Sequence, residues 1–576
     1  MNRYYIGLAT TFHDPAVAIV GPTGEILFAE AIERYVQSKR ALNCDPFMRM
    51  PALLREHCDA DGEFIVATTW SQPFTLLLTA AYVAGFFSLR TLRSVGSQVN
   101  RTLLEDDDEL AYGSFLHCMQ TSAGLGVLIG VQEAFGHSRV SIRRFPHHLT
   151  HAAHACYTSP FSEAVCLVAD GMGELGSMAL YRYEDGLLHT LWRRWGRESL
   201  GFLYSLITDL CGYDWRLGEE WKVMGLAPHG EFDPELYNLF RRIYRVERGM
   251  LRFASRSVIR ETVAELRKRA RKPDSSPLTA GNMAFVGQQV FSEIMLSILT
   301  HLDRAGISKN LALAGGCALN SSFNGTVLSQ THFTQLYVPC APGDDGNAVG
   351  AALLAYRQDH PYQHTPRPFQ TPYLGSALSA EALGRIARFC GSSRVRHMPG
   401  EIHRRAAQLL AQGKLLGWIQ GRAEFGPRAL GNRSILADPR RHDIKDLINT
   451  RVKFRESFRP FAPSILHEHG PAFLEHYQES PYMERVLHFR KDAAGRVPGV
   501  VHVDGTGRLQ TVKREWNSRF HDLISAFHEI TGVPLVLNTS FNIMGRPIVH
   551  SVEDVMGMFY TAGLDALVVE DYLAEK

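Results

Sequence analysis

The chain has 576 residues, a formal net charge of +2, 45% hydrophobic residues and 21% charged residues. At roughly 100–200 residues per domain this length predicts two to four domains, and the composition is that of an ordinary globular protein. The small net charge excludes an overall basic field of the kind that draws a whole protein onto nucleic acid. Nine cysteines without a Cys-x-x-Cys pair exclude zinc ribbons and a disulfide framework, and favour a reducing cytoplasm.

Two features of the first ninety residues argue against a membrane protein. Residues 1–14 lack the basic-then-apolar pattern of a secretory signal. The uncharged apolar run over 74–89 is shorter than the roughly 20 residues of a spanning helix, and Gly85 interrupts it. We therefore expect a cytoplasmic protein without a membrane partner, and a buried core helix at this run.

A pattern of strand, acidic loop, strand, tight turn and strand occurs twice. The first set of strands is predicted at 4–10, 16–20 and 26–31, with Phe12-His13-Asp14 after the first strand. The second set is predicted at 164–169, 177–183 and 187–193, with Asp170-Gly171-Met172-Gly173-Glu174 after the first strand. Two such units, each followed by helices, predict a duplicated α/β core of actin-like type with a nucleotide between its two loops. Two unrelated hairpins are the alternative interpretation.

The duplicated core is predicted to end near residue 358. A strand at 335–338 leads into a Gly-Asp-Asp-Gly loop at 343–346 and an alanine-rich helix over 349–356. Four prolines between residues 361 and 372 then indicate an extended linker. We expect a first domain over 1–358, a linker over 359–372 and a second domain over 373–576.

A histidine cluster follows Pro146, which can start a helix. His147 and His151 are four residues apart, so they share one helix face and can bind one divalent metal as neutral imidazoles. Asp170 at the end of the next strand and Asp344 in the Gly-Asp-Asp-Gly loop are the candidate carboxylate ligands. Carboxylates suit iron, manganese or magnesium. A polar helix face without metal is the alternative.

Glycine-rich turns follow two of the predicted strands. Gly171 and Gly173 follow the strand at 164–169, and Gly315 and Gly316 follow an apolar strand at 311–314. Glycine lets backbone N–H groups approach a phosphate closely, and a helix N-terminus beyond the turn favours an anion. In the order expected for an actin-like cleft these turns indicate nucleotide binding, whereas either turn alone is a common structural feature.

The second domain holds a basic stretch over 422–459. It contains ten Arg or Lys and five acidic residues, a surplus of +5 in a chain of net charge +2. Several of its cations neighbour aromatic residues and prolines, as in Phe425-Gly426-Pro427-Arg428 and Arg459-Pro460-Phe461, which is unusual for a solvated basic face. Guanidinium groups bind phosphate bidentately, so a half-buried cluster predicts a small phosphate ligand. A nucleic-acid surface or structural ion pairs are the alternatives.

Polar residues accompany the last predicted strands. One strand is predicted to end at 501–504, ahead of Arg508, and another at 535–537 leads into Asn538-Thr539-Ser540. Small polar side chains at a strand end can donate hydrogen bonds to carbonyl or phosphate oxygens.

Eight motifs along the chain form a recognisable set. They are Phe12-His13-Asp14, His147-His148-x-x-His151, Asp170-Gly171-x-Gly173-Glu174, Ser199-Leu200-Gly201, Lys222-Val223-Met224-Gly225-Leu226-Ala227, Gly421-Arg422-x-Glu424-Phe425-Gly426-Pro427-Arg428-Ala429-Leu430-Gly431, Arg459-Pro460-Phe461-Ala462-Pro463 and Leu537-Asn538-Thr539-Ser540-Phe541-Asn542. The set resembles the NodU/CmcH family of O-carbamoyltransferases over nearly the whole chain. Members of that family modify nodulation factors, cephamycins, aminoglycosides and ansamycins.

The resemblance implies an actin-like (ASKHA) first domain similar to Kae1, the universal tRNA threonylcarbamoyltransferase, and a second domain similar to YrdC/Sua-type threonylcarbamoyl-AMP synthases. The second domain would make carbamoyl-adenylate from carbamoyl phosphate and ATP with Mg²⁺, releasing phosphate and pyrophosphate. The intermediate would pass inside the protein to the first domain, where a small-molecule alcohol of antibiotic or toxin type attacks it. No nucleic acid or membrane is implied as a partner, and a homodimer is the candidate assembly.

The same resemblance implies roles for individual residues. Carbamoyl phosphate and ATP would be bound by Arg428, Lys453, Arg459, Arg508, Asn538 and Ser540. A divalent metal, with Fe(II) the favoured ion, would be bound by His147, His151, Asp170 and Asp344. The adenylate would be bound by Gly171, Gly173, Gly315, Gly316 and Asn320. His13 would be the general base for the acceptor hydroxyl, with Asp14 orienting it, and residues 90–133 are expected to shape the acceptor pocket.

Two other functions fit parts of the pattern. A tRNA-modifying enzyme of the threonylcarbamoyl type would need a broad basic surface, which the net charge of +2 and the localised basic stretch oppose. A non-catalytic regulator with an actin-like fold would not need the histidine cluster and the basic stretch together.

Overall fold

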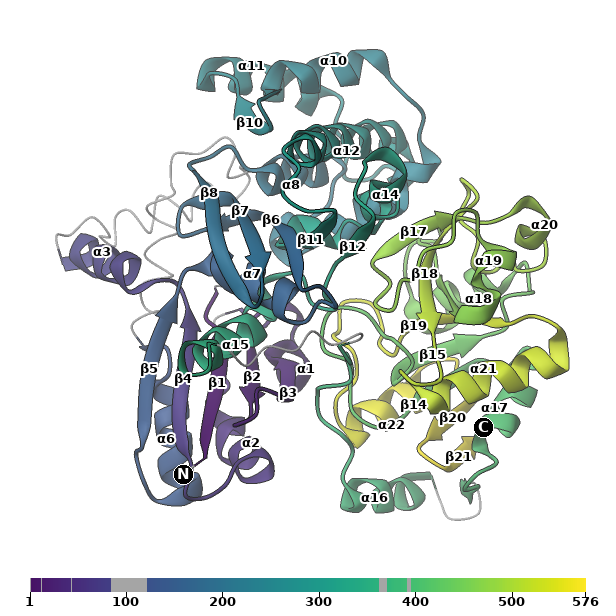
Figure 1. Cartoon of the computed structure of the whole chain (residues 1–576). Helices are drawn as coiled ribbons and strands as arrows, with labels where there is room; N and C mark the ends of the chain where they lie inside the picture. Colours follow the sequence, from purple (N-terminus) through teal and green to yellow (C-terminus); the bar gives the residue numbers. More distant parts are fainter. Residues whose placement is uncertain (1, 12, 43, 84–121, 362–369, 391–394) are drawn as a thin grey trace. The chain divides into compact units, whose positions relative to one another are not determined.

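The computed structural model describes residues 2–11, 13–42, 44–83, 122–361, 370–390 and 395–576. These residues form two compact units (Figure 1). Unit 1 comprises Met1–Ile32, Arg40–Leu319 and Val327–Gln370, and unit 2 comprises Glu33–Lys39, Asn320–Thr326 and Thr371–Lys576. Two short segments from the first part of the chain therefore pack within the C-terminal unit, which the linear order of the motifs does not reveal.

Unit 1 contains two five-stranded sheets. The first has the order β3-β2-β1-β4-β5 and consists of β1 (Arg3–Ala9), β2 (Ala16–Val20), β3 (Ile26–Ala31), β4 (Glu63–Thr69) and β5 (Val140–Phe145). The second has the order β12-β11-β6-β7-β8 and consists of β6 (Glu163–Gly173), β7 (Gly176–Glu184), β8 (Leu187–Trp195), β11 (Asn310–Ala314) and β12 (Gln335–Tyr337).

The two sheets of unit 1 share one topology. In each sheet the first three strands form an antiparallel meander. The first strand also pairs in parallel with the fourth, which pairs in parallel with the fifth. This repeat confirms the duplicated actin-like fold that the sequence predicted.

Several helices lie between these strands in the described part of the first 330 residues. They are α1 (Ile32–Val36), α2 (Met50–His57), α3 (Gln72–Val83), α6 (Leu125–Phe135), α7 (His147–Tyr157), α8 (Leu200–Leu210), α9 (Glu220–Leu226), α10 (Pro234–Ile243), α11 (Arg256–Lys268), α12 (Gly281–Arg304), α13 (Ser321–Asn324) and α14 (Val327–Gln330). A two-stranded sheet of β9 (Tyr244–Glu247) and β10 (Met250–Phe253) lies between α10 and α11 in the sequence.

Helix α15 (Asn347–Asp359) packs against both β1 and α7 (Figure 1). A side chain at Gly7 of β1 would place its Cβ 1.8 Å from the carbonyl oxygen of Ala348, and one at Gly350 would place its Cβ 1.9 Å from that of Thr150. Both positions therefore require glycine because of close backbone approach. The crossing fixes α7, which carries the histidine cluster, against the helix that begins just after Asp344.

Two helices of unit 1 are rich in apolar residues. Pro277–Arg304, which includes α12, is long and apolar enough to cross a membrane by length and composition alone, but core helices pass the same test and 56% of its most apolar window is buried. The run over 74–89 was expected to form a buried helix, and for its described part the expected burial is wrong. Leu76 and Leu77 of α3 are 58% and 57% exposed. Only the face that carries Thr75 and Leu78 is buried. Residues 84–89 lie outside the described residues, as do residues 90–121 of the expected acceptor region.

Unit 2 is built on a nine-stranded mixed sheet of order β13-β21-β20-β14-β15-β19-β16-β18-β17. Its strands are β13 (Val395–His397), β14 (Leu416–Ile419), β15 (Arg433–Ala437), β16 (Ala462–Leu466), β17 (Arg485–His488), β18 (Thr506–Val512), β19 (Leu535–Ser540), β20 (Ala566–Val569) and β21 (Tyr572–Glu575). Its helices are α16 (Ala380–Cys390), α17 (Ile402–Ala411), α18 (Ile444–Ile448), α19 (Gly470–Phe473), α20 (Lys491–Ala494), α21 (Ser518–Thr531) and α22 (Val552–Thr561). The expected α/β second domain is confirmed.

One strand of unit 2 was predicted in the wrong place. Residues 501–504 form a turn ahead of β18 instead of ending a strand. The Asp504 carboxylate accepts hydrogen bonds from the backbone N–H of Thr506 (3.0 Å) and from its hydroxyl (2.7 Å). Side-chain bonds of this kind close a turn and compete with strand pairing. Arg508 therefore lies within β18, not beyond the end of a strand.

We expect Gly350→Ala to destabilise unit 1 by about 1–3 kcal/mol, because the new methyl group must push α15 away from α7. Gly557→Ala in α22 is the matched control, since nothing lies within 4 Å of its added Cβ, and it should be neutral or slightly stabilising. Calorimetric unfolding measures both. Equal transition temperatures for the Gly350 variant and the unmodified protein would contradict the close crossing.

Candidate functional site

The predicted metal ligands of unit 1 come together in one cluster. Pro146 precedes α7 as its N-cap, and the helix turns the Nε2 atoms of His147 and His151 to within 3.1 Å of each other. Asp170 Oδ2 lies 3.3 Å from His147 Nε2, and Asp344 Oδ1 lies 3.3 Å from His151 Nε2. One ligand atom from each of the four side chains lies within 4.8 Å of all the others.

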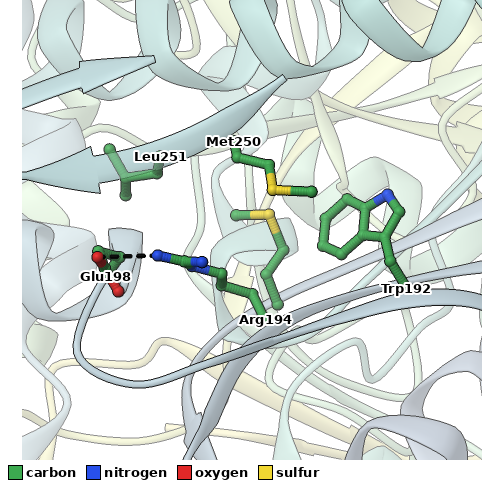
Figure 2. A pocket seen from close by; sticks show the side chains of 6 residues that line it. Trp192, Arg194, Glu198, Met250 and Leu251 are labelled. Carbon is green, nitrogen blue, oxygen red and sulfur yellow. Dashed lines mark ion pairs between the residues drawn. The ribbon is translucent and has the colours of Figure 1, made fainter. Parts of the chain in front are cut away.

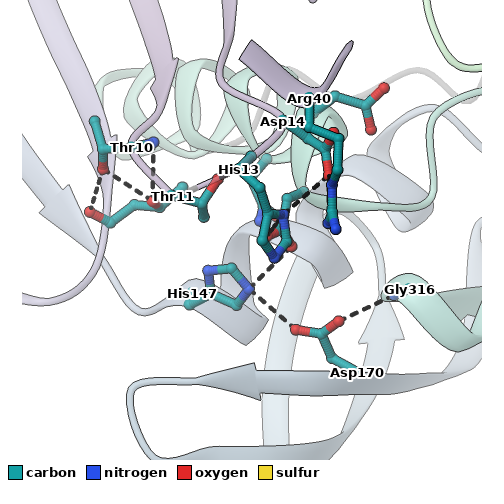
Figure 3. Close-up of polar contacts among 12 residues, drawn as sticks. Thr10, Thr11, His13, Asp14, Arg40, His147, Asp170 and Gly316 are labelled. Carbon is teal, nitrogen blue, oxygen red and sulfur yellow. Dashed lines mark hydrogen bonds and ion pairs between the residues drawn. The ribbon is translucent and has the colours of Figure 1, made fainter. Parts of the chain in front are cut away.

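The chain positions Asp170 from both sides (Figure 3). Its Oδ1 accepts a hydrogen bond from the backbone N–H of Gly316 (3.1 Å), which leaves Oδ2 directed at His147. Its backbone oxygen accepts one from the Ser199 hydroxyl (3.0 Å). A Cβ at Gly173 would lie 2.1 Å from the His147 ring, so this glycine is needed for the imidazole to pack against the loop. The motif residues around Asp170 thus orient the cluster.

A proton on His147 offsets part of the negative charge of the two carboxylates in this cluster. Burial lowers the pKa of His147, but hydrogen bonds to Asp170 and Asp344 outweigh it and raise that pKa to about 10. Burial and Asp344 raise the pKa of Asp170, yet the imidazoles hold it below its usual range. Burial keeps His148 and His154 neutral by lowering the pKa of each to about 3. A divalent cation would replace the proton as the balancing charge, as expected for metal binding to histidine and carboxylate.

The donor atoms of this cluster fit a divalent metal. Two imidazole nitrogens and two carboxylate oxygens converge from buried or nearly buried side chains, with exposed fractions between 1% and 11%. Two buried carboxylates this close to two imidazoles are the ligand type used for iron and manganese. The four residues predicted as ligands are therefore the four that the fold brings together.

His13 lies beside this cluster and is held by an ion-paired carboxylate. Its Nδ1 is 2.9 Å from Asp14 Oδ2, which also accepts hydrogen bonds from Arg40 Nε (3.2 Å) and Nη2 (3.0 Å). Burial raises the pKa of Asp14, but Arg40 and His13 outweigh it and lower that pKa to about 2. With Nδ1–H donated to Asp14, Nε2 is the ring nitrogen that can accept a proton.

Sequence reasoning missed Arg40, because nothing in the sequence links it to Asp14. Asp14 and Arg40 have φ angles of 56° and 61°, a left-handed conformation unusual for residues other than glycine. Such strained backbone often accompanies functional sites. Phe12 of the motif lies outside the described residues.

Unit 2 contains a cluster of five half-buried or buried cations, which we call the basic pocket. Its members are Arg428, Lys453, Arg455, Arg459 and Arg508. Burial lowers the pKa of Arg428 to about 10, and burial together with Arg459 lowers that of Arg455 to about 9. Burial and the charges of three neighbouring arginines lower the pKa of Arg508 as well. Repulsion among these buried cations indicates an anion-binding site, because a bound anion would offset their charge.

Arg455 was counted in the basic stretch but was not predicted as a site residue. Its guanidinium carbon lies 4.6 Å from the centre of the Phe461 ring, and its Nε donates to Asn449 Oδ1 (2.7 Å). The ring and the amide fix the guanidinium within the basic pocket. Glu456 pairs with Arg459 at 3.2 Å and offsets part of the charge.

Lys453 and Asn538, two predicted ligand-binding residues, hold the walls of this pocket together. Lys453 Nζ donates to the side-chain oxygen (2.7 Å) and backbone oxygen (2.9 Å) of Asn542, and also to the backbone oxygen of Ser540. Asn538 Nδ2 donates to Ala429 O (3.2 Å), next to Arg428. These contacts position the loops. Direct contact of either residue, or of Ser540, with a ligand stays a prediction.

The loop that carries Arg428 is organised by a carboxylate that sequence reasoning did not single out. Glu424 Oε1 accepts backbone hydrogen bonds from Leu430 (2.7 Å), Asn432 (2.8 Å) and Arg433 (3.0 Å). Arg433 is almost fully buried and donates to the backbone oxygens of the strand end that precedes the loop. Both ends of the loop are thereby closed around Arg428.

The structure gives the predicted adenylate-binding residues mixed support. Gly171 lies at the end of β6, and Gly315 N donates to Pro342 O (2.9 Å), which joins the two late loops. The N–H of Gly316 is already used by Asp170. Asn320 lies in the segment that packs with unit 2, where its side chain caps α13 by accepting from Phe323 N (3.0 Å). Nucleotide contacts by these residues stay a prediction.

A small hollow lies between the β7–β8 hairpin and the β9–β10 hairpin (Figure 2). Its lining includes Met178, Trp192 and Met250, and an ion pair of 2.8 Å joins Arg194 to Glu198 at its side. Its side chains lie so close together that it leaves no enclosed space for even a water-sized molecule. We therefore assign it no ligand.

Two protein-family models match successive parts of the chain. Residues 4–353 match the model of the carbamoyltransferase N-terminus, and residues 407–576 match that of the carbamoyltransferase C-terminus. The chain belongs to the carbamoyltransferase family and is a carbamoyltransferase enzyme.

Named relatives include two nodulation proteins. NolNO of Sinorhizobium fredii is 38% identical over 76% of this chain and 64% of its own length, and NolO of Bradyrhizobium diazoefficiens is 37% identical over 75% and 78%. An uncharacterized protein of Synechocystis is 35% identical over 75% of both chains. Among solved structures, full-length HypF in its phosphate- and nucleotide-bound form aligns with a TM-score of 0.37 and 9% identity, covering 62% of this chain and 55% of that one. A likeness at that level adds nothing about function.

We expect His147→Ala and His151→Ala each to weaken binding of Mn²⁺ by more than the roughly 10–100-fold that loss of an outer partner costs, since each removes a ligand atom. His154→Gln is the matched control, because His154 is equally buried on α7 but lies outside the cluster. Titration calorimetry of the three variants measures this. Equal weakening in all three would contradict the assignment of the ligands.

We expect Arg508→Met to stabilise ligand-free unit 2 by about 1 kcal/mol or more, because it removes one of the mutually repelling buried cations. The same variant should lose the rise in unfolding temperature that added phosphate gives the unmodified protein. Arg388→Met at an exposed position of α16 should change neither quantity. A destabilised Arg508 variant with an unchanged phosphate response would contradict an anion site.

Proposed function

We propose that this carbamoyltransferase is an ATP-dependent O-carbamoyltransferase with two chemical steps. The second domain makes carbamoyl-adenylate from carbamoyl phosphate and ATP, with Mg²⁺ bound to the triphosphate. The first domain transfers the carbamoyl group to a hydroxyl of a small natural product of antibiotic or toxin type. The observation that carries the proposal is the presence of two different centres in one chain, a basic pocket and a histidine–aspartate cluster with a histidine base beside it.

The basic pocket suits the activation step. Arg428, Arg455, Arg459 and Arg508 together offer guanidinium donors for the phosphate groups of both substrates. Water would release phosphate from carbamoyl phosphate, the carbamate oxygen would bond to the α-phosphorus of ATP, and pyrophosphate would leave. The surrounding positive charge stabilises the charge that develops on the phosphate oxygens during both displacements.

The histidine-containing centre suits the transfer step. His13 Nε2 would take the proton of the acceptor hydroxyl while the oxygen attacks the carbamoyl carbon and AMP leaves, and Asp14 with Arg40 would keep Nδ1 protonated. A divalent cation held by His147, His151, Asp170 and Asp344, with Fe(II) the favoured ion, would supply positive charge for the departing AMP phosphate. Because the mixed anhydride is water-labile, a closed internal route from the second domain to the first would protect it from hydrolysis.

Further parts of the proposal concern organisation and location. We keep 1–358 and 373–576 as the two catalytic domains, joined by 359–372. The seven described cysteines whose side chains are placed are free thiols, which supports a reducing cytoplasm. The acceptor is proposed as the main partner besides the substrates, with a homodimer as the assembly to examine and no nucleic-acid or membrane partner.

The decisive experiment measures pyrophosphate release from ATP and carbamoyl phosphate without acceptor. The unmodified protein should release pyrophosphate. Arg459→Ala should reduce this by about 100-fold, the effect of losing a buried charge-assisted contact, whereas His13→Ala should keep the release and lose transfer.

Arg388→Ala, at an exposed position in the same unit, is the control and should retain both steps. A folded protein with added metal that releases no pyrophosphate would rule out carbamoyl-adenylate formation. Equal loss of the first step in the Arg459 and His13 variants would show that the roles are not divided in this way.

A further inference from the structure

Asn347 is a completely buried amide at the edge of the histidine–aspartate cluster. It is the first residue of α15, three residues after Asp344. Its side-chain nitrogen lies 3.1 Å from His151 Nε2, and its side-chain oxygen lies 2.9 Å from the Thr150 hydroxyl. Neither the sequence motifs nor the family resemblance assigned it a role.

The hydrogen bonds around this amide do not balance in that orientation. The Thr150 hydroxyl has one hydrogen but faces two acceptors, His147 O at 2.6 Å and Asn347 Oδ1 at 2.9 Å. His151 Nε2 has one lone pair but faces two nitrogens at 3.1 Å, one from His147 and one from Asn347. In each case the available hydrogen or lone pair can serve only one of the two contacts, so the other contact is not a hydrogen bond.

Exchanging the oxygen and nitrogen of the amide resolves the conflict. The two atoms are nearly equal in size, and their assignment follows only from their hydrogen bonds. After the exchange Asn347 Nδ2 donates to the Thr150 hydroxyl, which donates to His147 O, so each group has a partner. Asn347 Oδ1 then faces His151 Nε2 and the atoms that converge on the metal position.

We propose that Asn347 supplies a fifth ligand, its amide oxygen, to the metal site, and that Thr150 is the positioning residue that holds the amide in this orientation. The inference rests on the metal site of the proposed function. Ligand atoms about 2.1 Å from one octahedral ion lie about 3.0 Å apart. The separations of 3.1 Å from His151 Nε2 to His147 Nε2 and to the Asn347 amide match that spacing.

The added oxygen has a consequence for the choice of metal. Two nitrogens and three oxygens favour Mn²⁺, Fe²⁺ or Mg²⁺, which accept six ligands rich in oxygen. Zn²⁺ is usually satisfied by four ligands, which the two histidines and two aspartates already provide. Asn347 would therefore act as a selectivity residue that favours octahedral ions over Zn²⁺.

The test is titration calorimetry of the nucleotide-free full chain with Mn²⁺ and, separately, with Zn²⁺. Asn347→Leu keeps the size but removes the oxygen, so Mn²⁺ affinity should fall by about tenfold or more while Zn²⁺ affinity changes little. Asn347→Asp retains a ligand oxygen and should bind Mn²⁺ at least as tightly as the unmodified protein. Thr150→Val should give a smaller loss for Mn²⁺, because it frees the amide to turn.

Three results separate the inferences. Weak Mn²⁺ binding by both the Leu and the Asp variants would show that Asn347 donates an N–H to His151, and would overturn the ligand assignment. Equal Mn²⁺ binding by the Leu variant and the unmodified protein would overturn it too. Absence of binding of either ion by the unmodified protein would instead refute the metal site itself. Circular dichroism shows which variants are folded, and the Asp and Val variants keep the test decisive if the Leu variant is not.

Discussion

The close packing of α15 against β1 on one side and α7 on the other is the constraint on which the site of unit 1 depends. Gly7 and Gly350 allow backbones to touch where any other residue would hold them apart. Because His147 and His151 lie on α7 and Asp344 and Asn347 lie at the start of α15, this contact sets the distances among the ligand atoms. The histidine–aspartate cluster is in this sense a product of helix packing.

Unit 2 holds several positively charged side chains close together. It keeps several arginines and a lysine out of water with few acids to offset them, which costs stability in the absence of an anion. The nine-stranded sheet and the Glu424-bound loop supply the rigidity that holds like charges together. In the proposed function this cost in stability is offset, since a phosphate-bearing substrate would remove the repulsion.

Sequence patterns predicted much of this arrangement. The repeated strand–loop–strand pattern predicted the duplicated sheets, and helical spacing placed His147 and His151 on one face. They failed where the determining contact is remote in sequence or carries no periodic signal. Arg40 meets Asp14 through a strained turn, residues 501–504 form a side-chain-closed turn, and half of α3 is exposed although its residues are apolar.

The sequence by itself determined the fold class, the family and the chemical types present, because strand periodicity, helix spacing and long motifs are local properties of the chain. Only the tertiary structure decided which side chains share a site. It joined Asn347 to the histidines, added Arg455 to the basic pocket, and assigned Lys453 and Asn538 to its walls. Those assignments depend on distances between segments far apart in the chain, and such distances arise only when the elements pack.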